Sequence, residues 1–353
     1  MNRIWVDGCF DFFHHGHAGA LNQARALGDA LVVGIHTDEE ILKNKGPVVM
    51  HLDERACAVR ACRWTSEVVC DAPYVTEFRV MDAHHCEYVA HGDDITTDAN
   101  GNDCYQAAKD AGRFLEFKRT PNISTTDLIG RMLARTTAHH MDAGSPFLQS
   151  EDAQQRFAMY ARGEDERSPY AGVFNYTANG IVQFVAPQWR AEVVYTEGTF
   201  DLFHPGHMEF LAGVAARARE LGAKVVVGLR SDAAANAVRG EGHPTMNIFE
   251  RALCLLQCRF VDAVVLNVPF ATDSAARVHE IERALNTKVV AVARGSRAPA
   301  PGDNLAAGLV VPPGKYAALS ASQIVERVLS NRAQYEERQR KKGVKAVHEE
   351  TMR

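Results

Sequence analysis

The sequence lacks the features that mark several large classes of protein. It contains no run of about 18 apolar residues, so no helix is expected to span a membrane. Its 39 basic residues are outnumbered by 44 acidic ones, giving a formal net charge of −5, whereas nucleic-acid-binding proteins usually carry a basic excess. We therefore expect neither a transmembrane protein nor a protein that binds nucleic acid.

The eight cysteines form no Cys-x-x-Cys pair of the kind expected for a zinc or redox site. Most lie in apolar segments, where free thiols are commonly buried. The chain begins with an expected strand and not with a charged leader followed by an apolar stretch, which would indicate a secretory signal. These observations predict reduced thiols, no metal ion held by protein ligands, and a cytoplasmic location.

What is present is a long internal repeat. The segment Gly8–His17 (G-C-F-D-F-F-H-H-G-H) recurs as Gly198–His207 (G-T-F-D-L-F-H-P-G-H), at an offset of 190 residues. The pair Glu54-Arg55 recurs as Glu250-Arg251, at an offset of 196. Because the offset grows only by small insertions, the repeat indicates a duplicated domain, and 353 residues suffice for two domains that each bury a core.

Strand and helix signals alternate within each copy. The β-branched runs Arg3–Val6 and Glu192–Tyr195 each lead through a glycine-containing loop into a helix, and the apolar strands Ala30–Ile35 and Lys224–Leu229 follow. This alternation predicts an α/β protein with two tandem Rossmann-like, doubly wound parallel-sheet domains. Ligands bind such sheets at the carboxyl ends of the strands.

The expected domain boundaries follow from the repeat. Residues 1–138 form the first copy and residues 190–335 the second. Residues 139–189 contain Gly-Ser-Pro and Ser-Pro sequences and a charged run, which indicate a linker lying on the surface. Residues 336–353 form a basic tail, expected to be a solvated helix end with at most peripheral contact with a membrane.

Two histidines in each copy point to an anion site. His14 and His17 are three residues apart where a helix begins, so both imidazoles can face one site. The N–H groups and the dipole of a helix N-terminus favour phosphate, and Gly16 lets the backbone approach a ligand closely. The sequence therefore predicts a phosphate-binding turn, repeated at His204 and His207.

These motifs resemble a known family. G-x-F-D-x-F-H-x-G-H resembles the signature of the H-x-G-H nucleotidyltransferases, and Arg119–Thr126 (R-T-P-N-I-S-T-T) resembles the R-T-x-G-I-S-T-T motif of the cytidylyltransferases among them. The similarity spans nearly all of residues 1–135. Pro121-Asn122 departs from the usual glycine, but Asn is one of the few residues that accept a positive φ.

The resemblance implies an activity. The tandem arrangement is similar to that of the family members that transfer CMP from CTP to phosphoethanolamine, forming CDP-ethanolamine for phospholipid synthesis. The phosphate of phosphoethanolamine is anionic and needs no general base, so catalysis consists of positioning and charge stabilisation. Mg²⁺ is expected to accompany CTP through phosphate oxygens and water.

The resemblance also implies site residues in the first copy. His14 and His17 would contact the α-phosphate, Lys45 would bridge the two substrates, and Arg119 would hold the outer phosphates, which makes these four the candidate catalytic residues. The implied CTP-binding residues are Gly8, Cys9, Phe10, Asp11, Gly16, Asp94, Arg119, Thr120, Ile123, Ser124 and Thr125. The implied residues for the second substrate are Lys45, Arg63, Tyr74, Asp93 and Tyr105.

Several alternatives remain open from the sequence. Asp11 either orients the loop or helps to hold a magnesium shell, and Asp94 contacts either cytosine or the substrate ammonium. The second copy has Arg239-Gly240 in place of Lys45-Gly46 and lacks the Arg-Thr of the nucleotide motif, so we expect it not to turn over. Cytidylyl transfer to phosphocholine or glycerol 3-phosphate, or a nucleotide-sensing scaffold without activity, are the competing functions. A homodimer is expected as a possible assembly.

Overall fold

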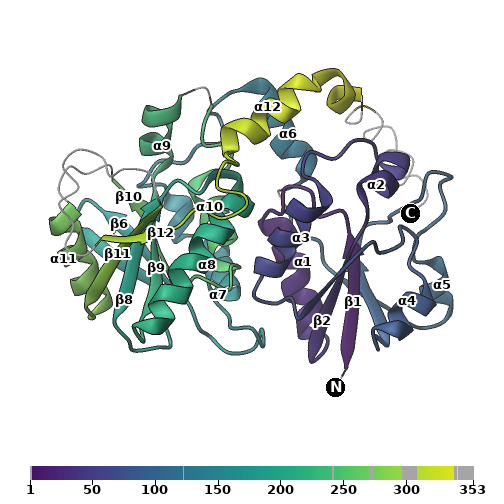
Figure 1. Cartoon of the computed structure of the whole chain (residues 1–353), viewed down its shortest axis with the longest axis horizontal. Helices are drawn as coiled ribbons and strands as arrows, with labels where there is room; N and C mark the ends of the chain where they lie inside the picture. The colour runs from purple at the N-terminus through teal and green to yellow at the C-terminus, as the bar shows by residue number, and fades with distance from the viewer. Residues whose placement is uncertain are drawn as a thin grey trace. The chain divides into compact units, whose positions relative to one another are not determined.

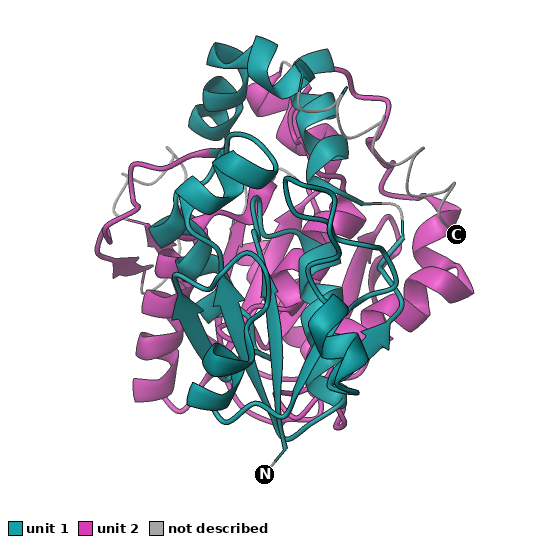
Figure 2. Cartoon of the chain, turned by 90° about the vertical axis from the view of Figure 1, so that its right-hand side faces the viewer, with its two compact units in different colours: residues 1–134, 321–353 teal, residues 135–320 magenta. Residues whose placement is uncertain are grey.

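The structure is a computed structural model of the chain (Figure 1). It describes residues 2–121, 123–240, 242–269, 274–295, 308–337 and 340. The chain divides into two units. Unit 1 comprises Met1–Ala134 and Ala321–Arg353, and unit 2 comprises Arg135–Ser320 (Figure 2).

Unit 1 is built on a five-stranded parallel sheet with strand order β3-β2-β1-β4-β5. Its strands are β1 (Arg3–Gly8), β2 (Ala30–Ile35), β3 (Glu67–Cys70), β4 (Tyr88–Gly92) and β5 (Phe114–Phe117). Its helices are α1 (His15–Ala26), α2 (Asp38–Asn44), α3 (Leu52–Ala61), α4 (Phe78–Ala83), α5 (Gln106–Asp110), α6 (Thr125–Ala134) and α12 (Ala321–Ser330). The chain reverses its winding direction at β1, so the ligand crevice is expected at the carboxyl ends of β1 and β4.

The core of unit 1 explains why these segments become strands. β2 is buried along its whole length, which matches the continuous apolar run expected of a central parallel strand. Trp5 of β1 and Val89 of β4 pack into one buried cluster with Met81 of α4. Burial of apolar surface on both faces therefore fixes the sheet and the direction of its carboxyl ends.

Unit 2 repeats this arrangement and extends it. Its seven-stranded sheet has the order β12-β11-β8-β9-β10-β6-β7, in which β10-β9-β8-β11-β12 reproduces the strand order of unit 1. The strands are β6 (Gly172–Thr177), β7 (Gly180–Val185), β8 (Val193–Gly198), β9 (Lys224–Arg230), β10 (Ala263–Val268), β11 (Val289–Gly295) and β12 (Gly308–Val311). The helices are α7 (Glu151–Tyr160), α8 (Pro205–Glu220), α9 (Asp232–Arg239), α10 (Ile248–Leu256) and α11 (Ser274–Leu285), with short 3₁₀ turns at Pro146–Gln149 and Asp201–Phe203. The expected tandem α/β fold is confirmed.

The expected linker at residues 139–189 needs correction, because part of it belongs to the second sheet. β6 pairs in parallel with β10, and β7 pairs antiparallel with β6 across a two-residue turn. Val173 and Phe174 are at most 1% exposed. The Asn179-Gly180 pair between alternating apolar residues was the available signal for this hairpin, and burial against β10 stabilises β6.

The C-terminal boundary of the second copy also differs from the expected residue 335. α12 packs against α6 and is grouped with unit 1, so unit 2 ends at Ser320. Most of the basic tail, including residues 338, 339 and 341–353, lies outside the described residues, as does Asn122. In the part of the chain that the structure describes, no helix is long and apolar enough to cross a membrane. All eight cysteines are free thiols.

Candidate active site

The turn after the first strand has the same unusual backbone in both copies. Phe10 and Phe12 have φ of 53° and 50°, and Phe200 and Leu202 have φ of 50° and 55°. The left-handed conformation costs about 1–2 kcal/mol for each such residue. All four side chains are buried, and their burial offsets this strain. The turn delivers the histidines to the first turn of the following helix.

The two histidines of the first copy form a stacked pair at the N-terminus of α1. His14 is the N-cap residue, and its Nδ1 accepts the N–H of Gly16 at 3.1 Å. The ring proton therefore resides on Nε2, which can donate to a phosphate oxygen. The His14 and His17 rings have centroids 4.0 Å apart and planes inclined by 18°. The equivalent rings of His204 and His207 are 3.7 Å apart.

Gly16 lets the two sequence motifs of the first copy meet. A Cβ atom at Gly16 would lie 2.7 Å from Ile123 and 2.9 Å from the ring of His14, so a side chain does not fit there. Ile123 belongs to the Arg119–Thr126 motif, and the Thr125 hydroxyl donates to the Asp11 carbonyl at 3.3 Å. The motif and the histidine turn therefore form one site.

The carboxylate of Asp11 is used inside the protein. Asp11 is 2% exposed, and its two oxygens accept the N–H groups of Val49 and Met50 at 3.0 and 2.9 Å. Of the two roles left open by the sequence, the geometry supports orientation of the loop. Asp201 accepts the N–H groups of Thr245 and Met246 in the same way. Burial alone would raise the pKa of Asp201, but these hydrogen bonds and a contact with His243 lower it below its ordinary value.

A buried arginine, which the sequence reasoning noted only as part of a repeat, reinforces this loop. Arg55 donates to the carbonyls of Met50, Cys9 and His36 and pairs with Asp38. Arg251 makes the same set of contacts in the second copy, with Met246, Thr199, Arg230 and Asp232. The repeated Glu-Arg pair was the signal in the sequence for this structural staple.

Lys45 is the C-cap residue of α2 and leads into the loop held by Asp11. Its N–H donates to the Ile41 carbonyl at 2.8 Å, and the following Gly46 has φ of 102°, which favours glycine. The Lys45 ammonium lies 5.8 Å from the centroid of the Tyr74 ring. Burial raises the pKa of Tyr74 to about 12, so its hydroxyl stays protonated. Arg63 is buried in the turn that follows α3.

Arg119 is oriented by two acidic residues at the end of β4. Its backbone N–H donates to Asp93 at 3.0 Å, and its guanidinium lies 3.2 Å from Asp94. Asp93 and Asp94 were expected at the substrates, whereas here both contact Arg119. The ion pair is about half exposed, and exposed pairs contribute only about 0–1 kcal/mol. Arg119 can therefore exchange Asp94 for a phosphate at little cost.

The N-terminus of α6 adds further donors. The Asp127 N–H donates to the Ser124 hydroxyl oxygen at 3.1 Å, so Ser124 is the expected N-cap. Thr120 precedes this turn and is partly exposed. Gly8 and Cys9 lie directly before the histidine turn, at the carboxyl end of β1. This helix N-terminus and that of α1 therefore border the same crevice.

A second buried carboxylate at the end of β1 was missed by the sequence reasoning. Asp7 is 4% exposed and accepts hydrogen bonds from Trp5 Nε1 (2.8 Å), Thr76 Oγ1 (2.7 Å) and Tyr105 (2.7 Å). All three are neutral donors. Burial, together with the charge of Asp7, raises the pKa of Tyr105 well above its ordinary value, so Tyr105 remains a donor. An acidic residue at the end of an apolar strand was the available signal.

Aromatic rings surround this carboxylate. Tyr105 lies 4.6 Å from the ring of His91, and Tyr74 lies 4.9 Å from the ring of His36, measured between centroids. Burial lowers the pKa of His36, against the opposing effect of the Asp7 charge, so His36 stays neutral. An anionic carboxylate among aromatic rings is suited to an ammonium group. Tyr74 and Tyr105 thus belong to one buried cluster, and their contact with the second substrate stays a prediction.

In the second copy, the carboxylate that corresponds to Asp7 is paired with side chains of its own unit. Glu197 stands where Asp7 stands in β1, and it accepts from Arg277 (2.9 Å), Arg230 (3.4 Å) and Tyr195 (3.0 Å). Arg230 matches His36 in the strand register. Lys315 takes the place of Arg119 and lies 4.7 Å from the ring of Tyr316. The carboxylate that would attract an ammonium is therefore already paired with two guanidinium groups.

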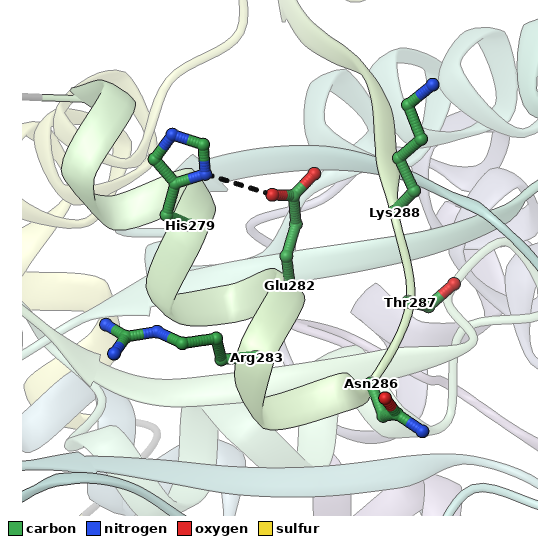
Figure 3. A pocket seen from close by; sticks show the side chains of 6 residues that line it. All are labelled: His279, Glu282, Arg283, Asn286, Thr287 and Lys288. Carbon is green, nitrogen blue, oxygen red and sulfur yellow. Dashed lines mark hydrogen bonds and ion pairs between the residues drawn. The ribbon is translucent and has the colours of Figure 1, made fainter.

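A surface depression of about 790 Å³ in unit 2 lies elsewhere. It is lined by His279, Glu282, Arg283, Asn286, Thr287 and Lys288, at the end of α11 and before β11 (Figure 3). His279 and Glu282 are hydrogen-bonded to each other, and Glu282 also accepts the Val289 N–H. Because it adjoins the amino end of β11, it is not at the ligand edge of the sheet.

The fold and the site together define a nucleotidyltransferase. Each unit places an H-x-G-H turn at the carboxyl ends of a parallel sheet, and the first adds a lysine, an arginine and a Ser-Thr-capped helix. The model of the Cytidylyltransferase-like family matches residues 5–131 and again residues 195–303.

Sequence comparison narrows this class. The chain is 40% identical to the ethanolamine-phosphate cytidylyltransferase of Dictyostelium discoideum, over 98% of this chain and 96% of that protein. It is 38% identical to the Mus musculus protein of the same name, over 98% of this chain and 90% of the relative. Choline-phosphate cytidylyltransferase A of Mus musculus is 42% identical but matches only 37% of this chain. The chain belongs to the ethanolamine-phosphate cytidylyltransferase family.

Proposed function

We propose that the first copy transfers CMP from CTP to phosphoethanolamine, giving CDP-ethanolamine and pyrophosphate. Family membership over both copies supports this reaction. The observation on which this proposal rests is that two sites lie side by side at the end of β1. One is the buried Asp7 carboxylate, and the other is the histidine turn that begins directly after it. Phosphoethanolamine carries an ammonium and a phosphate, and these two sites have the complementary charges.

The reaction needs no general base in this site. The phosphate of phosphoethanolamine is the nucleophile and attacks the α-phosphorus of CTP in line, so the bond to pyrophosphate breaks as the new P–O bond forms. His14 and His17 donate hydrogen bonds to the α-phosphate, where negative charge is redistributed. Lys45 neutralises charge between the two phosphates. Arg119 and the N-terminus of α6 hold the leaving pyrophosphate.

Magnesium is proposed as part of the CTP substrate. In the described part of the chain, no three His, Cys, Asp or Glu side chains are grouped to hold a metal ion. Asp11, the acidic residue nearest the histidines in sequence, is occupied by two backbone N–H groups. This donor set fits an ion carried by triphosphate oxygens and water, and Mg²⁺ supplies charge neutralisation of the triphosphate when bound.

The preference for ethanolamine follows from the chemistry of Asp7. A primary ammonium can donate hydrogen bonds to this carboxylate, whereas the trimethylammonium of phosphocholine has no N–H to donate. A charged hydrogen bond contributes about 1.5–3 kcal/mol, enough for about a tenfold to hundredfold preference. Glycerol 3-phosphate would leave the buried carboxylate without a cation.

The test is pyrophosphate release from CTP with phosphoethanolamine, phosphocholine or glycerol 3-phosphate offered in turn. We expect turnover with phosphoethanolamine, and ATP should not replace CTP. Equal rates with phosphocholine would contradict the role of Asp7, and an absence of turnover with all three acceptors would favour a nucleotide-sensing scaffold. A cytoplasmic location and a homodimer also remain predictions, and sedimentation analysis would decide the second.

A further inference from the structure

The chain segment that follows the second copy in sequence folds as part of unit 1. α12 packs against α6 (Figure 1) and is grouped with unit 1 (Figure 2). Its side chains Ile324 and Val328 are completely buried. α6 carries Ser124 and Thr125 of the candidate active site at its N-terminus. Apolar packing thus fixes α12 on the catalytic unit. It brings Arg327 of α12, and Tyr335 a few residues further along the chain, to the loop that follows Lys45.

The guanidinium group of Arg327 binds the loop that follows Lys45. Its Nη1 donates to the carbonyl of Val49 at 3.1 Å. Its two terminal nitrogens pair with both oxygens of Glu54, at 2.7 and 2.8 Å. Glu54 is 5% exposed and also accepts the His51 N–H, which closes the N-terminus of α3. This bidentate ion pair has a defined geometry that a lysine cannot reproduce.

Tyr335 adds a second contact beside the first. Its side chain is buried, and its hydroxyl donates to the Val48 carbonyl at 3.0 Å. On the other side of the loop, Asp11 accepts the N–H groups of Val49 and Met50. Val49 is therefore held through both its carbonyl and its N–H. Only Gly46 and Pro47 separate this fixed stretch from Lys45.

The second copy holds its own loop by a matching contact. Pro244 stands at the place of Val48, and its carbonyl accepts from His139 Nε2 at 2.8 Å and from His140 Nε2 at 2.9 Å. His139 and Tyr335 are 196 residues apart, the same offset that relates Val48 to Pro244. Each loop is therefore clasped by residues that follow the other copy in the sequence.

We propose that Arg327 and Tyr335 are positioning residues for Lys45, so that the catalytic site of the first copy is complete only when the C-terminal segment of the chain is in place. The inference rests on the function proposed above for Lys45. The clasp fixes the loop directly downstream of the lysine, and a displacement of about 1 Å of a reacting or positioning group can cost up to 10²-fold in rate. The segment that contributes to turnover therefore follows the second copy in sequence but folds as part of unit 1.

Hydrogen exchange tests the clasp without requiring activity. In Arg327→Ala and in Tyr335→Phe, the amides of Val49 and Met50 should exchange about tenfold faster or more, because local opening becomes easier. Arg332→Ala is the matched control, since Arg332 lies on the same segment and forms an exposed pair with Glu336. Unchanged exchange in both test variants would overturn the clasp. Tyr335→Phe removes one hydroxyl and keeps the test valid if Arg327→Ala does not fold.

Kinetics test the consequence for Lys45. We expect kcat to fall about tenfold in Arg327→Ala and less in Tyr335→Phe, with a rise in KM for phosphoethanolamine and partial rescue by Arg327→Lys. General destabilisation would instead lower the melting temperature and leave KM unchanged. Faster exchange with unchanged kcat and KM would overturn the positioning role. If the wild-type protein releases no pyrophosphate, the proposed function fails, whereas the exchange experiment still decides whether the clasp exists.

Discussion

The two copies share a scaffold and differ in the charges placed on it. Both have the stacked histidine pair, the buried aspartate that holds the following loop, and the arginine staple of Arg55 or Arg251. They differ at the carboxyl end of the first strand. There Asp7 is surrounded by neutral donors, whereas Glu197 is paired with Arg230 and Arg277.

This difference separates the framework of a nucleotidyltransferase from its chemistry. The framework depends on buried backbone contacts, which are costly to lose because an unpaired buried polar group is destabilising. The acceptor site depends on a carboxylate that accepts from three neutral donors, whereas in the second copy two internal arginines neutralise the corresponding charge. A copy can therefore lose its second substrate while its phosphate-binding turn keeps the same geometry.

The largest effect should come from the histidine pairs. His17→Ala should lower kcat by about 10² or more, because it removes a donor to the charge that develops in the transition state. His207→Ala should leave kcat near the wild-type value. Steady-state pyrophosphate release measures both. Equal losses would show that both copies react, and near-normal turnover of His17→Ala would contradict the assignment of the first copy.

The matched cations at the loop should give the next largest difference. Lys45→Ala should reduce kcat by about tenfold to hundredfold, since a charged donor contributes about 1.5–3 kcal/mol. Arg239→Ala, at the corresponding position of the second copy, should not change kcat. The same pyrophosphate assay applies. A comparable loss in Arg239→Ala would mean that the second copy takes part in the reaction.

The two strand-end carboxylates should affect different quantities. Asp7→Asn should raise KM for phosphoethanolamine about tenfold, with little change in KM for CTP, because the amide keeps the shape but loses the charge. Glu197→Gln should leave both KM values unchanged and lower the melting temperature of unit 2, since Arg230 and Arg277 lose their counter-charge. Kinetics and calorimetry measure the two effects. A change in KM in Glu197→Gln would contradict this division.

The smallest effect should be a pH dependence of stability in unit 2. Burial, together with His204 and Arg239, lowers the pKa of His207 well below its ordinary value of 6.5. Below pH 6.5 the unfolded chain therefore binds a proton that the folded unit does not, and the free energy of unfolding falls as the pH falls. His207→Asn should make the melting temperature less dependent on pH between neutral and mildly acidic conditions. An unchanged slope would mean that other groups dominate.

The sequence by itself determined the local features. Its apolar run Ala30–Ile35 predicted the central strand β2 to the residue, because a parallel strand buried on both faces is continuously apolar. The edge strand Phe114–Phe117 was also predicted at its observed bounds. Its motifs predicted the histidine turn and the N-cap at Ser124, since both depend on residues within one turn of the chain. These features are set by short-range sterics and hydrogen bonding.

Only the tertiary structure decided which distant side chains meet. No local signal shows that Arg277 reaches Glu197, that Tyr105 reaches Asp7, or that Arg327 lies on the loop after Lys45, since each pair is at least 80 residues apart. The hairpin of β6 and β7 had a local signal at Asn179-Gly180, but its place beside β10 depends on residues about 90 positions away and came only from the tertiary structure. Which groups share a crevice depends on the packing of the whole chain. That packing surrounds Asp7 with neutral donors in the first copy and pairs Glu197 with arginines in the second, and this difference distinguishes the candidate catalytic copy from its duplicate.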